Sequence, residues 1–108
     1  MTKVLFRKWR KGGDIDAIFP ELPGTNDPAT RSCYSHIGQH SSCDSNYYLG
    51  KTVPSTPEEY ADLLTELKSI GYDDLVIVKK MTQADYEARK REIGRISEYP
   101  YTQEADNA

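Results

Sequence analysis

The fold is decided by residues 55–79, STPEEYADLLTELKSIGYDDLVIVK, which carry the signals for both ends of a helix and then a β-rich run. Thr56 is the predicted N-cap. Pro57 falls at the first helical position, where its missing N–H does no harm. Glu59 lies three residues after the cap and completes a capping box. Gly71 suits the left-handed backbone at which helices end. The stretch therefore predicts a helix that starts at Thr56 and stops before Gly71.

The apolar residues of this helix recur at helical spacing and predict one buried stripe. The following run, Leu75–Lys79, is rich in β-branched residues and predicts a strand that is central in the sheet, beside the N-terminal hairpin. The helix and this strand are expected to bury Leu63, Leu64, Leu67, Ile70, Val76 and Val78.

An N-terminal hairpin is predicted from two β-rich runs, Val4–Trp9 and Ile15–Phe19, joined through Gly12 and Gly13, because glycine adopts positive φ without steric cost. Three of the six prolines fall in the next segment, which predicts a loop. The remaining expected elements before the helix are the loop Pro20–Thr30, a strand Ser32–Ile37, a turn Gly38–Asn46 and a short strand Tyr47–Val53.

A second helix is expected to begin at Thr82, with Asp85 three positions further on as its capping partner. Its apolar stripe is thin and consists of Tyr86, Ile93 and Ile96, so the helix should lie on the surface or against a partner. Residues 98–108 are polar and interrupted by proline, which predicts a flexible tail. The sequence thus predicts a single α+β domain over residues 1–97, with an antiparallel sheet of four to five strands, one main helix on one face and a second C-terminal helix.

Composition limits the classes of function. The chain has 108 residues, 37% of them apolar, and a net charge of −3, which fits one globular domain and argues against general nucleic-acid binding. No apolar run approaches the length of a membrane span, and no signal peptide is recognisable, so a cytoplasmic location is expected. Eight tyrosines favour a partner surface, and a homodimer stays open.

Both cysteines and both histidines lie within CYSHIGQHSSC, residues 33–43. Cys33, His36, His40 and Cys43 have the donor set of a structural zinc site, although all four would come from eleven consecutive residues and strand alternation separates Cys33 from His36. A disulfide, a cysteine–histidine nucleophile pair and a buried, unreactive Cys33 are the other interpretations. No cofactor is expected unless the zinc interpretation holds.

The interpretation we prefer is a binding turn. His36, Gln39 and His40 surround one glycine and offer donors and acceptors to a ligand or to a partner backbone. Tyr34 would add a flat contact surface. Trp9 and Arg10 lie in a basic segment that could face an anion, or simply form a solvated hairpin edge. Asp14 and Asp16 share a strand face near the hairpin turn and, with Glu21, form a weaker candidate for a cation site.

The segments FRKW, AIFPELPGTNDP, CYSHIGQH and TPEEYADLLTELKSIGYDDLVIVKK together resemble a family of small uncharacterised proteins encoded by bacteriophages and bacterial genomes. The resemblance implies no catalytic residues. It does imply a non-enzymatic binding protein of phage or mobile-element type. Such a protein would block a host protein, for example one of a defence system, or sequester a small anionic ligand such as a nucleotide signal. The alternative is a small metal-dependent or thiol enzyme that uses the cysteine–histidine cluster.

Overall fold

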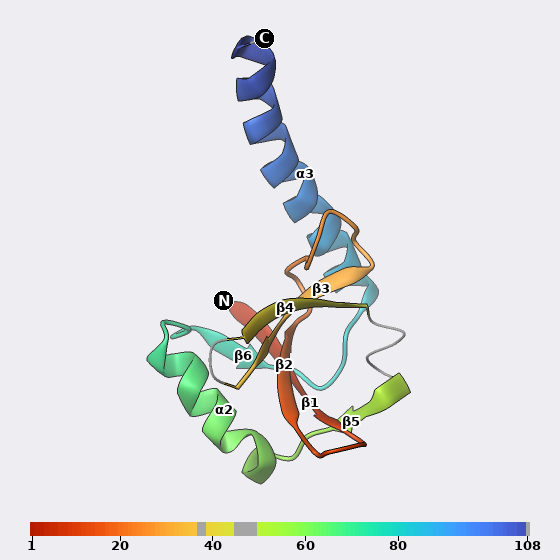
Figure 1. Ribbon diagram of the computed structural model, residues 1–108, viewed down its shortest axis with the longest axis vertical. Coiled ribbons are helices and arrows are strands. Elements are labelled where there is room, and N and C mark those ends of the chain that lie inside the picture. The colour runs from red at the N-terminus through yellow and green to blue at the C-terminus, as the bar shows by residue number, and fades with distance from the viewer. Residues whose placement is uncertain (37–38, 45–49, 108) are drawn as a thin grey trace.

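The computed structural model describes the backbone of residues 1–36, 39–44 and 50–107, and the side chains of residues 1–36, 41–43 and 50–95. Its elements are a mostly antiparallel sheet and two long helices, so the α+β class is confirmed (Figure 1). The strands are β1 (Thr2–Trp9), β2 (Ile15–Phe19), β3 (Thr30–Ser35), β4 (Gln39–Asp44), β5 (Thr52–Pro54) and β6 (Leu75–Ile77). The helices are α2 (Pro57–Ser69) and α3 (Gln83–Asn107).

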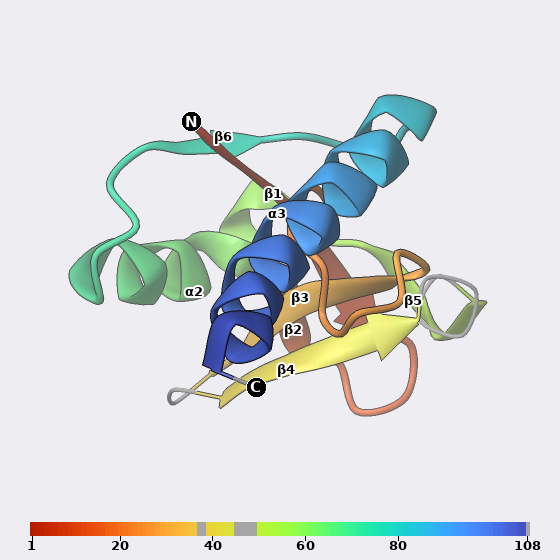
Figure 2. The same ribbon diagram turned by 90° about the horizontal axis from the view of Figure 1, so that it is seen from above.

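The strand order is β4-β3-β2-β1-β5, and β6 also pairs with β1. The free side of β1 is divided between two short strands. β5 pairs antiparallel with its second half at Arg7–Trp9, and β6 pairs parallel with its first half at Thr2–Val4. Figure 2 shows β6 beside the start of β1, where the chain returns from α2. Over the residues that the structure describes, the sheet therefore has six strands and a single parallel pair.

The predicted hairpin is confirmed. Gly12 and Gly13 have φ values of 93° and 76°, the left-handed conformation that only glycine adopts cheaply. The backbone N–H of Trp9 donates to the carbonyl of Asp14 at 2.8 Å and closes the turn. This turn sets the register in which Leu5 pairs with Ile18.

The main helix is also confirmed at both ends. The Glu59 backbone N–H donates to Thr56 Oγ1 at 3.3 Å, and the Thr56 N–H donates to Glu59 Oε1 at 2.9 Å, which is the reciprocal capping box. Gly71 follows the helix with φ of 116°. α2 therefore begins and ends where its local sequence signals place it.

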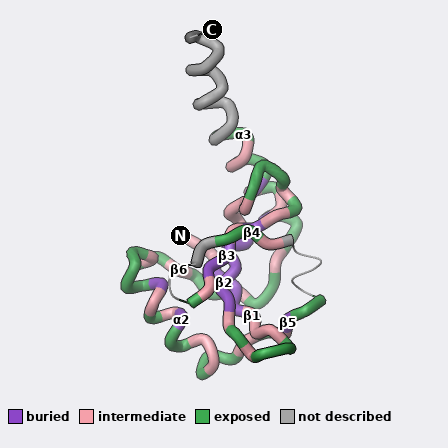
Figure 3. Tube along the Cα trace, in the orientation of Figure 1, coloured by how far each residue is buried: buried purple, intermediate pink, exposed green. Residues whose placement is uncertain are grey.

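The main core lies between α2 and one face of the sheet. Figure 3 shows the buried residues concentrated in the middle of β1, β2 and β3. Two aromatic stacks extend this core outward: Phe6 on Tyr60 at 4.2 Å between ring centroids, and Phe19 on Tyr72 at 5.1 Å. Its buried residues are Val4, Phe6, Ala17, Phe19, Tyr34, Leu63 and Leu67.

The prediction of a central strand over Leu75–Lys79 is wrong. β6 has only three residues and pairs with the first residues of β1, and among the described residues no strand covers its other side. Val76 and Ile77 are consequently 36% and 43% exposed. Ile70, at the end of α2, is 48% exposed, so the prediction that Ile70 and Val76 are buried is wrong. The β-branched composition correctly indicated a strand, but a local pattern does not say which neighbours that strand will find.

The other residues that were expected in the core pack on two different faces of the sheet. Leu63 and Leu67 are buried as predicted, and Leu64 is partly buried against the same core. Val78 packs on the opposite face of the sheet, against a smaller cluster formed by Leu5, Ile18 and Cys33.

The prediction of a turn over Gly38–Asn46 is wrong where the structure describes it. Residues 39–44 form β4, which pairs with β3 along its whole length and lies at the edge of the sheet. Its polar sequence, QHSSCD, fits a strand that has a neighbour on one side only. Residues 37–38 and 45–49 lie outside the described residues, and the expected strand Tyr47–Val53 corresponds to β5 only at Thr52 and Val53.

α3 begins with the predicted cap, in which the Thr82 N–H donates to Asp85 Oδ2 at 2.8 Å. Its first turns bury Asp85 and Arg89, each 1% exposed, rather than an apolar stripe through Tyr86. The C-terminal part of the helix extends away from the body of the molecule (Figure 1). The backbone of residues 98–107 belongs to this helix. The predicted flexibility of the segment stays a prediction. Neither α2 nor α3, as far as their described residues go, has the apolar length that crossing a bilayer requires.

Candidate functional site

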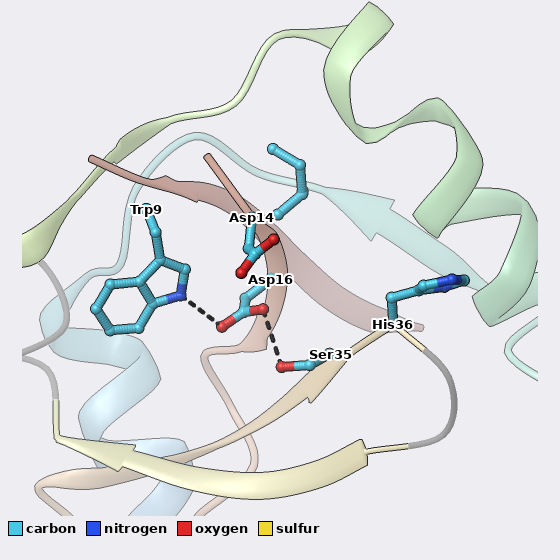
Figure 4. A pocket seen from close by; sticks show the side chains of 6 residues that line it. Trp9, Asp14, Asp16, Ser35 and His36 are labelled. Carbon is cyan, nitrogen blue, oxygen red and sulfur yellow. Dashed lines mark hydrogen bonds between the residues drawn. The ribbon is translucent and has the colours of Figure 1, made fainter. Parts of the chain in front are cut away.

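A cleft of about 380 Å³ opens at the end of the sheet where β2 begins and β3 ends (Figure 4). The hairpin turn and the strand register bring its walls together. Asp16 pairs with Ser35 across β2 and β3, and Trp9 at the end of β1 lies beside the same carboxylate, to which its indole N–H donates. The lining residues are Trp9, Asp14, Ile15, Asp16, Ser35 and His36.

The centre of the cleft is the carboxylate of Asp16, a residue that is only 8% exposed. Trp9 Nε1 donates to Asp16 Oδ2 at 2.9 Å, and Ser35 Oγ donates to Asp16 Oδ1 at 2.9 Å (Figure 4). These two donors compensate for the burial of the charge. Each carboxylate oxygen keeps a further lone pair that a ligand donor can use.

A second hollow of about 300 Å³ continues from the first along the start of β2 toward α2. Asp14, Ile15 and His36 line both. Asp62 and Glu59 add carboxylates from α2. Lys8 is hydrogen-bonded to Glu59 and, together with the backbone at Thr56, lowers the pKa of Glu59 to about 2. Around the two hollows, carboxylates outnumber the cations.

Glu66 on α2 fixes the imidazole of His36. His36 Nδ1 is hydrogen-bonded to Glu66 Oε1, and the hydroxyl of Tyr34 donates to Glu66 Oε2. Figure 4 shows the ring of His36 turned away from Trp9. Tyr34 is 1% exposed, so it positions Glu66 and does not offer the flat contact surface expected from the sequence.

Most of the basic N-terminal segment is paired with other groups. Lys3 Nζ is 3.0 Å from Asp85 Oδ1, and Arg7 donates to the hydroxyl and the carbonyl of Thr52. Lys8 pairs with Glu59. Arg10 lies exposed at the hairpin turn and is not part of the cleft lining. Arg10 and Lys11 thus remain the exposed cations of this segment, and its anion-facing role stays a prediction.

The cysteine–histidine cluster is divided by the sheet. Cys33 packs on the face opposite α2, together with Cys43, whereas His36 is bonded to α2. The side chains of Gln39 and His40 lie outside the described residues, and their backbones pair with Ser35 and Tyr34. Among the side chains that the structure describes, no three histidine, cysteine or acidic residues gather to hold a metal ion.

The sequence indicated some of the residues that line the cleft. Trp9 and His36 both line it, and so do Asp14 and Asp16, which were considered only as a cation site with Glu21. The sequence predicted no role in a site for Ser35. Glu66 carries no local signal, because it is one of many acidic residues on a helix surface.

No family model, no curated protein and no solved structure matches this chain. The resemblance to small phage-encoded proteins remains an expectation from the sequence.

Proposed function

We propose that the protein is a non-enzymatic binding protein that holds a basic segment of a partner protein in the cleft at Asp16. The observation that carries this proposal is a buried carboxylate that forms one wall of an open cleft. Asp14 beside it, and Asp62 in the adjoining hollow, extend the negative surface toward α2. Such a surface attracts cations and repels anions.

An arginine side chain has the chemistry that this cleft recognises. Its planar guanidinium presents several N–H donors, which suit the unused lone pairs of a carboxylate. The indole of Trp9 forms a neighbouring wall, on which a guanidinium can stack. Lysine would supply the charge but not the planar group.

The same charges argue against the second version of the hypothesis, a sponge for an anionic nucleotide. A phosphate in this cleft would lie close to the carboxylates of Asp14 and Asp16. Lys8, the cation of β1 that lies near this end of the sheet, is held by Glu59. The resemblance to phage-encoded proteins supports a host protein as the target.

The alternative of a thiol or metal enzyme has less support. A cysteine–histidine pair needs the two side chains within hydrogen-bond reach of each other. Cys33 and His36 lie on opposite faces of β3, and His36 Nδ1 is occupied by Glu66. A binding role needs no such pair.

The test uses Trp9, the single tryptophan, as the reporter. Titration with an oligoarginine peptide should change its fluorescence and give a saturable curve. Asp16→Asn keeps the shape and removes the charge, and it should weaken binding at least about tenfold. The matched control is Asp73→Asn, an exposed aspartate just before β6 at the other end of β1, which should bind like the wild type.

Two results would contradict the proposal. One is equal affinity of the wild type and Asp16→Asn for oligoarginine, with both proteins folded by circular dichroism. The other is tighter binding of an oligoglutamate peptide than of oligoarginine.

A further inference from the structure

The face of the sheet opposite α2 brings the two cysteines together. Cys33 on β3 is buried, Cys43 on β4 is half-buried, and both carry free thiols. In the register of the two strands Cys33 pairs with Ser41 and Cys43 pairs with Arg31, so the cysteines are diagonal neighbours on one face. Cys43 packs against the apolar cluster to which Cys33 belongs.

We propose that Cys33 and Cys43 form a reversible oxidation site, in which hydrogen peroxide converts the two thiols into a disulfide that joins β3 to the edge strand β4. This inference does not depend on the proposed binding function. It assigns a chemical use to the one part of the cysteine–histidine cluster that the structure keeps together.

The position of β4 makes closure feasible. It pairs with β3, and among the described residues no strand lies on its other side. An edge strand can shift without breaking a second ladder, so the sulfurs can approach to bonding distance. Cys43 is partly accessible from this edge, and Cys33 is 3% exposed, so peroxide reaches Cys33 when the same shift of β4 uncovers it.

Hydrogen bonds, rather than charged neighbours, favour a thiolate at Cys33. Arg31 lies opposite Cys43 on β3 and acts to lower the pKa of Cys43, whereas Asp16 on β2 acts to raise the pKa of both cysteines. Hydrogen bonding from the Cys43 thiol lowers the pKa of Cys33 to about 7, against the effect of burial and with help from Ser41, whose Oγ is 3.0 Å from the sulfur. The same interaction raises the pKa of Cys43. The pair therefore loses its first proton easily and its second with difficulty.

The chemistry balances with peroxide as the two-electron oxidant. The Cys33 thiolate attacks one peroxide oxygen, the O–O bond breaks, and hydroxide leaves and takes up a proton to become water. Cys33 is then a sulfenic acid. The sulfur of Cys43 attacks the sulfur of Cys33, the S–O bond breaks, and the thiol proton leaves with the hydroxyl as a second water. A dithiol reductant reverses the step by exchange.

The experiment treats the reduced full-length protein with a small excess of hydrogen peroxide at neutral pH. The intact mass should fall by two hydrogens, and the protein should stay monomeric on a non-reducing gel. A non-reducing digest should yield the peptide that joins Cys33 to Cys43, and dithiothreitol should remove it.

Variants make the test specific. Cys43→Ser should give no internal cross-link and should accumulate a sulfenic acid at Cys33 that dimedone traps. Ser41→Ala keeps both thiols and should still form the cross-link. The proposal is overturned if both wild-type thiols remain open to alkylation after treatment, if only links between chains appear, or if Cys33 passes to sulfinic acid without pairing. The wild-type peptide map decides the matter even if a variant fails to fold.

Discussion

At the scale of single residues, the attachment of α3 depends on charge rather than on apolar contact. Arg89 is 1% exposed and donates to the carbonyl of Pro20 at 2.6 Å and to that of Pro28 at 2.8 Å. Both carbonyls belong to the Pro20–Thr30 loop, so one guanidinium fastens this loop to the helix. The sequence did not reveal the role because the thin apolar stripe of the helix suggested no docking face.

Replacing Arg89 with alanine should therefore be costly. The change leaves two carbonyls without their charged donor and opens space beneath the loop. The free energy of unfolding should fall by about 2–4 kcal/mol. Urea unfolding followed by circular dichroism measures it.

Arg91→Ala is the matched control for this measurement. Arg91 is exposed on the same helix, and its loss should change stability by less than about 0.5 kcal/mol. Similar losses in Arg89→Ala and Arg91→Ala would show that Arg89 does not fasten the loop.

The pair of Lys3 and Asp85 gives the protein a pH dependence of stability. Burial raises the pKa of Asp85, but the hydrogen bonds from the Thr82 backbone and from Lys3 outweigh it, and the net pKa is lowered. A carboxylate with a lowered folded pKa stabilises above its unfolded value and loses that contribution as pH falls through the folded value. The hydrogen bond with Asp85 raises the pKa of Lys3, whose contribution is lost only as pH rises through that higher value.

Urea unfolding from pH 7 downward should thus show a fall in stability that begins near pH 4, the ordinary aspartate range. In Asp85→Asn the stability at neutral pH should be lower and the part of the acid slope that belongs to Asp85 should be missing. An unchanged slope in this variant would mean that Asp85 does not link folding to protons.

At the scale of elements, the sequence correctly predicted those helices and turns that are determined by a few neighbouring residues. The cap at Thr56, the glycine at position 71 and the Gly12–Gly13 turn act within a few residues, so α2 and the hairpin were predictable. β4 pairs with the strand just before it, but its polar sequence, QHSSCD, carries no β-rich signal. The edge position of β6 depends on pairing with β1 at the start of the chain. The local sequence of neither strand specifies the strand with which it pairs.

Gly24 lets the Pro20–Thr30 loop pack closely against β4, and a substitution can test this contact. A Cβ at this position would lie 2.3 Å from the Cβ of Ser42 and 2.6 Å from the carbonyl oxygen of Arg31. Because one of these neighbours is backbone, Gly24→Ala should destabilise the protein by about 1–3 kcal/mol. Thermal or urea unfolding measures the loss.

Gly94→Ala is the matched control, and it is expected to change stability in the opposite direction. A Cβ there meets nothing within 4 Å, and the residue lies in α3. Alanine should stabilise this helix position by up to about 1 kcal/mol. If Gly24→Ala is as harmless as Gly94→Ala, the loop does not pack closely on β4.

The end of α3 provides a prediction for the C-terminal segment. Pro100 lacks the N–H that a helix interior uses, which weakens the helix around it. Removal of residues 98–108 should change the free energy of unfolding by less than about 0.5 kcal/mol and leave the fluorescence of Trp9 unchanged. A larger loss of stability would show that the segment packs on the body and that the domain extends beyond residue 97.

At the scale of the whole molecule, the candidate site is a product of topology. Trp9, Asp16, Ser35 and His36 come from three strands, and the meander brings them to one end of the sheet. The sequence could nominate Trp9 and His36 by residue type. Strand alternation correctly separated Cys33 from His36, but the sequence could not show that Asp16 lies between Trp9 and His36, nor that Glu66 holds the histidine.

Binding of a basic partner segment in the cleft at Asp16, as proposed, is tested most directly by NMR. The backbone amide resonances of the ¹⁵N-labelled protein are followed during titration with oligoarginine. We expect saturable shifts centred on residues 9, 14–16 and 35–36, little change at residues 75–77, and loss of these shifts in Asp16→Asn. Shifts that spread evenly over the surface, or that persist unchanged in Asp16→Asn, would contradict the proposal.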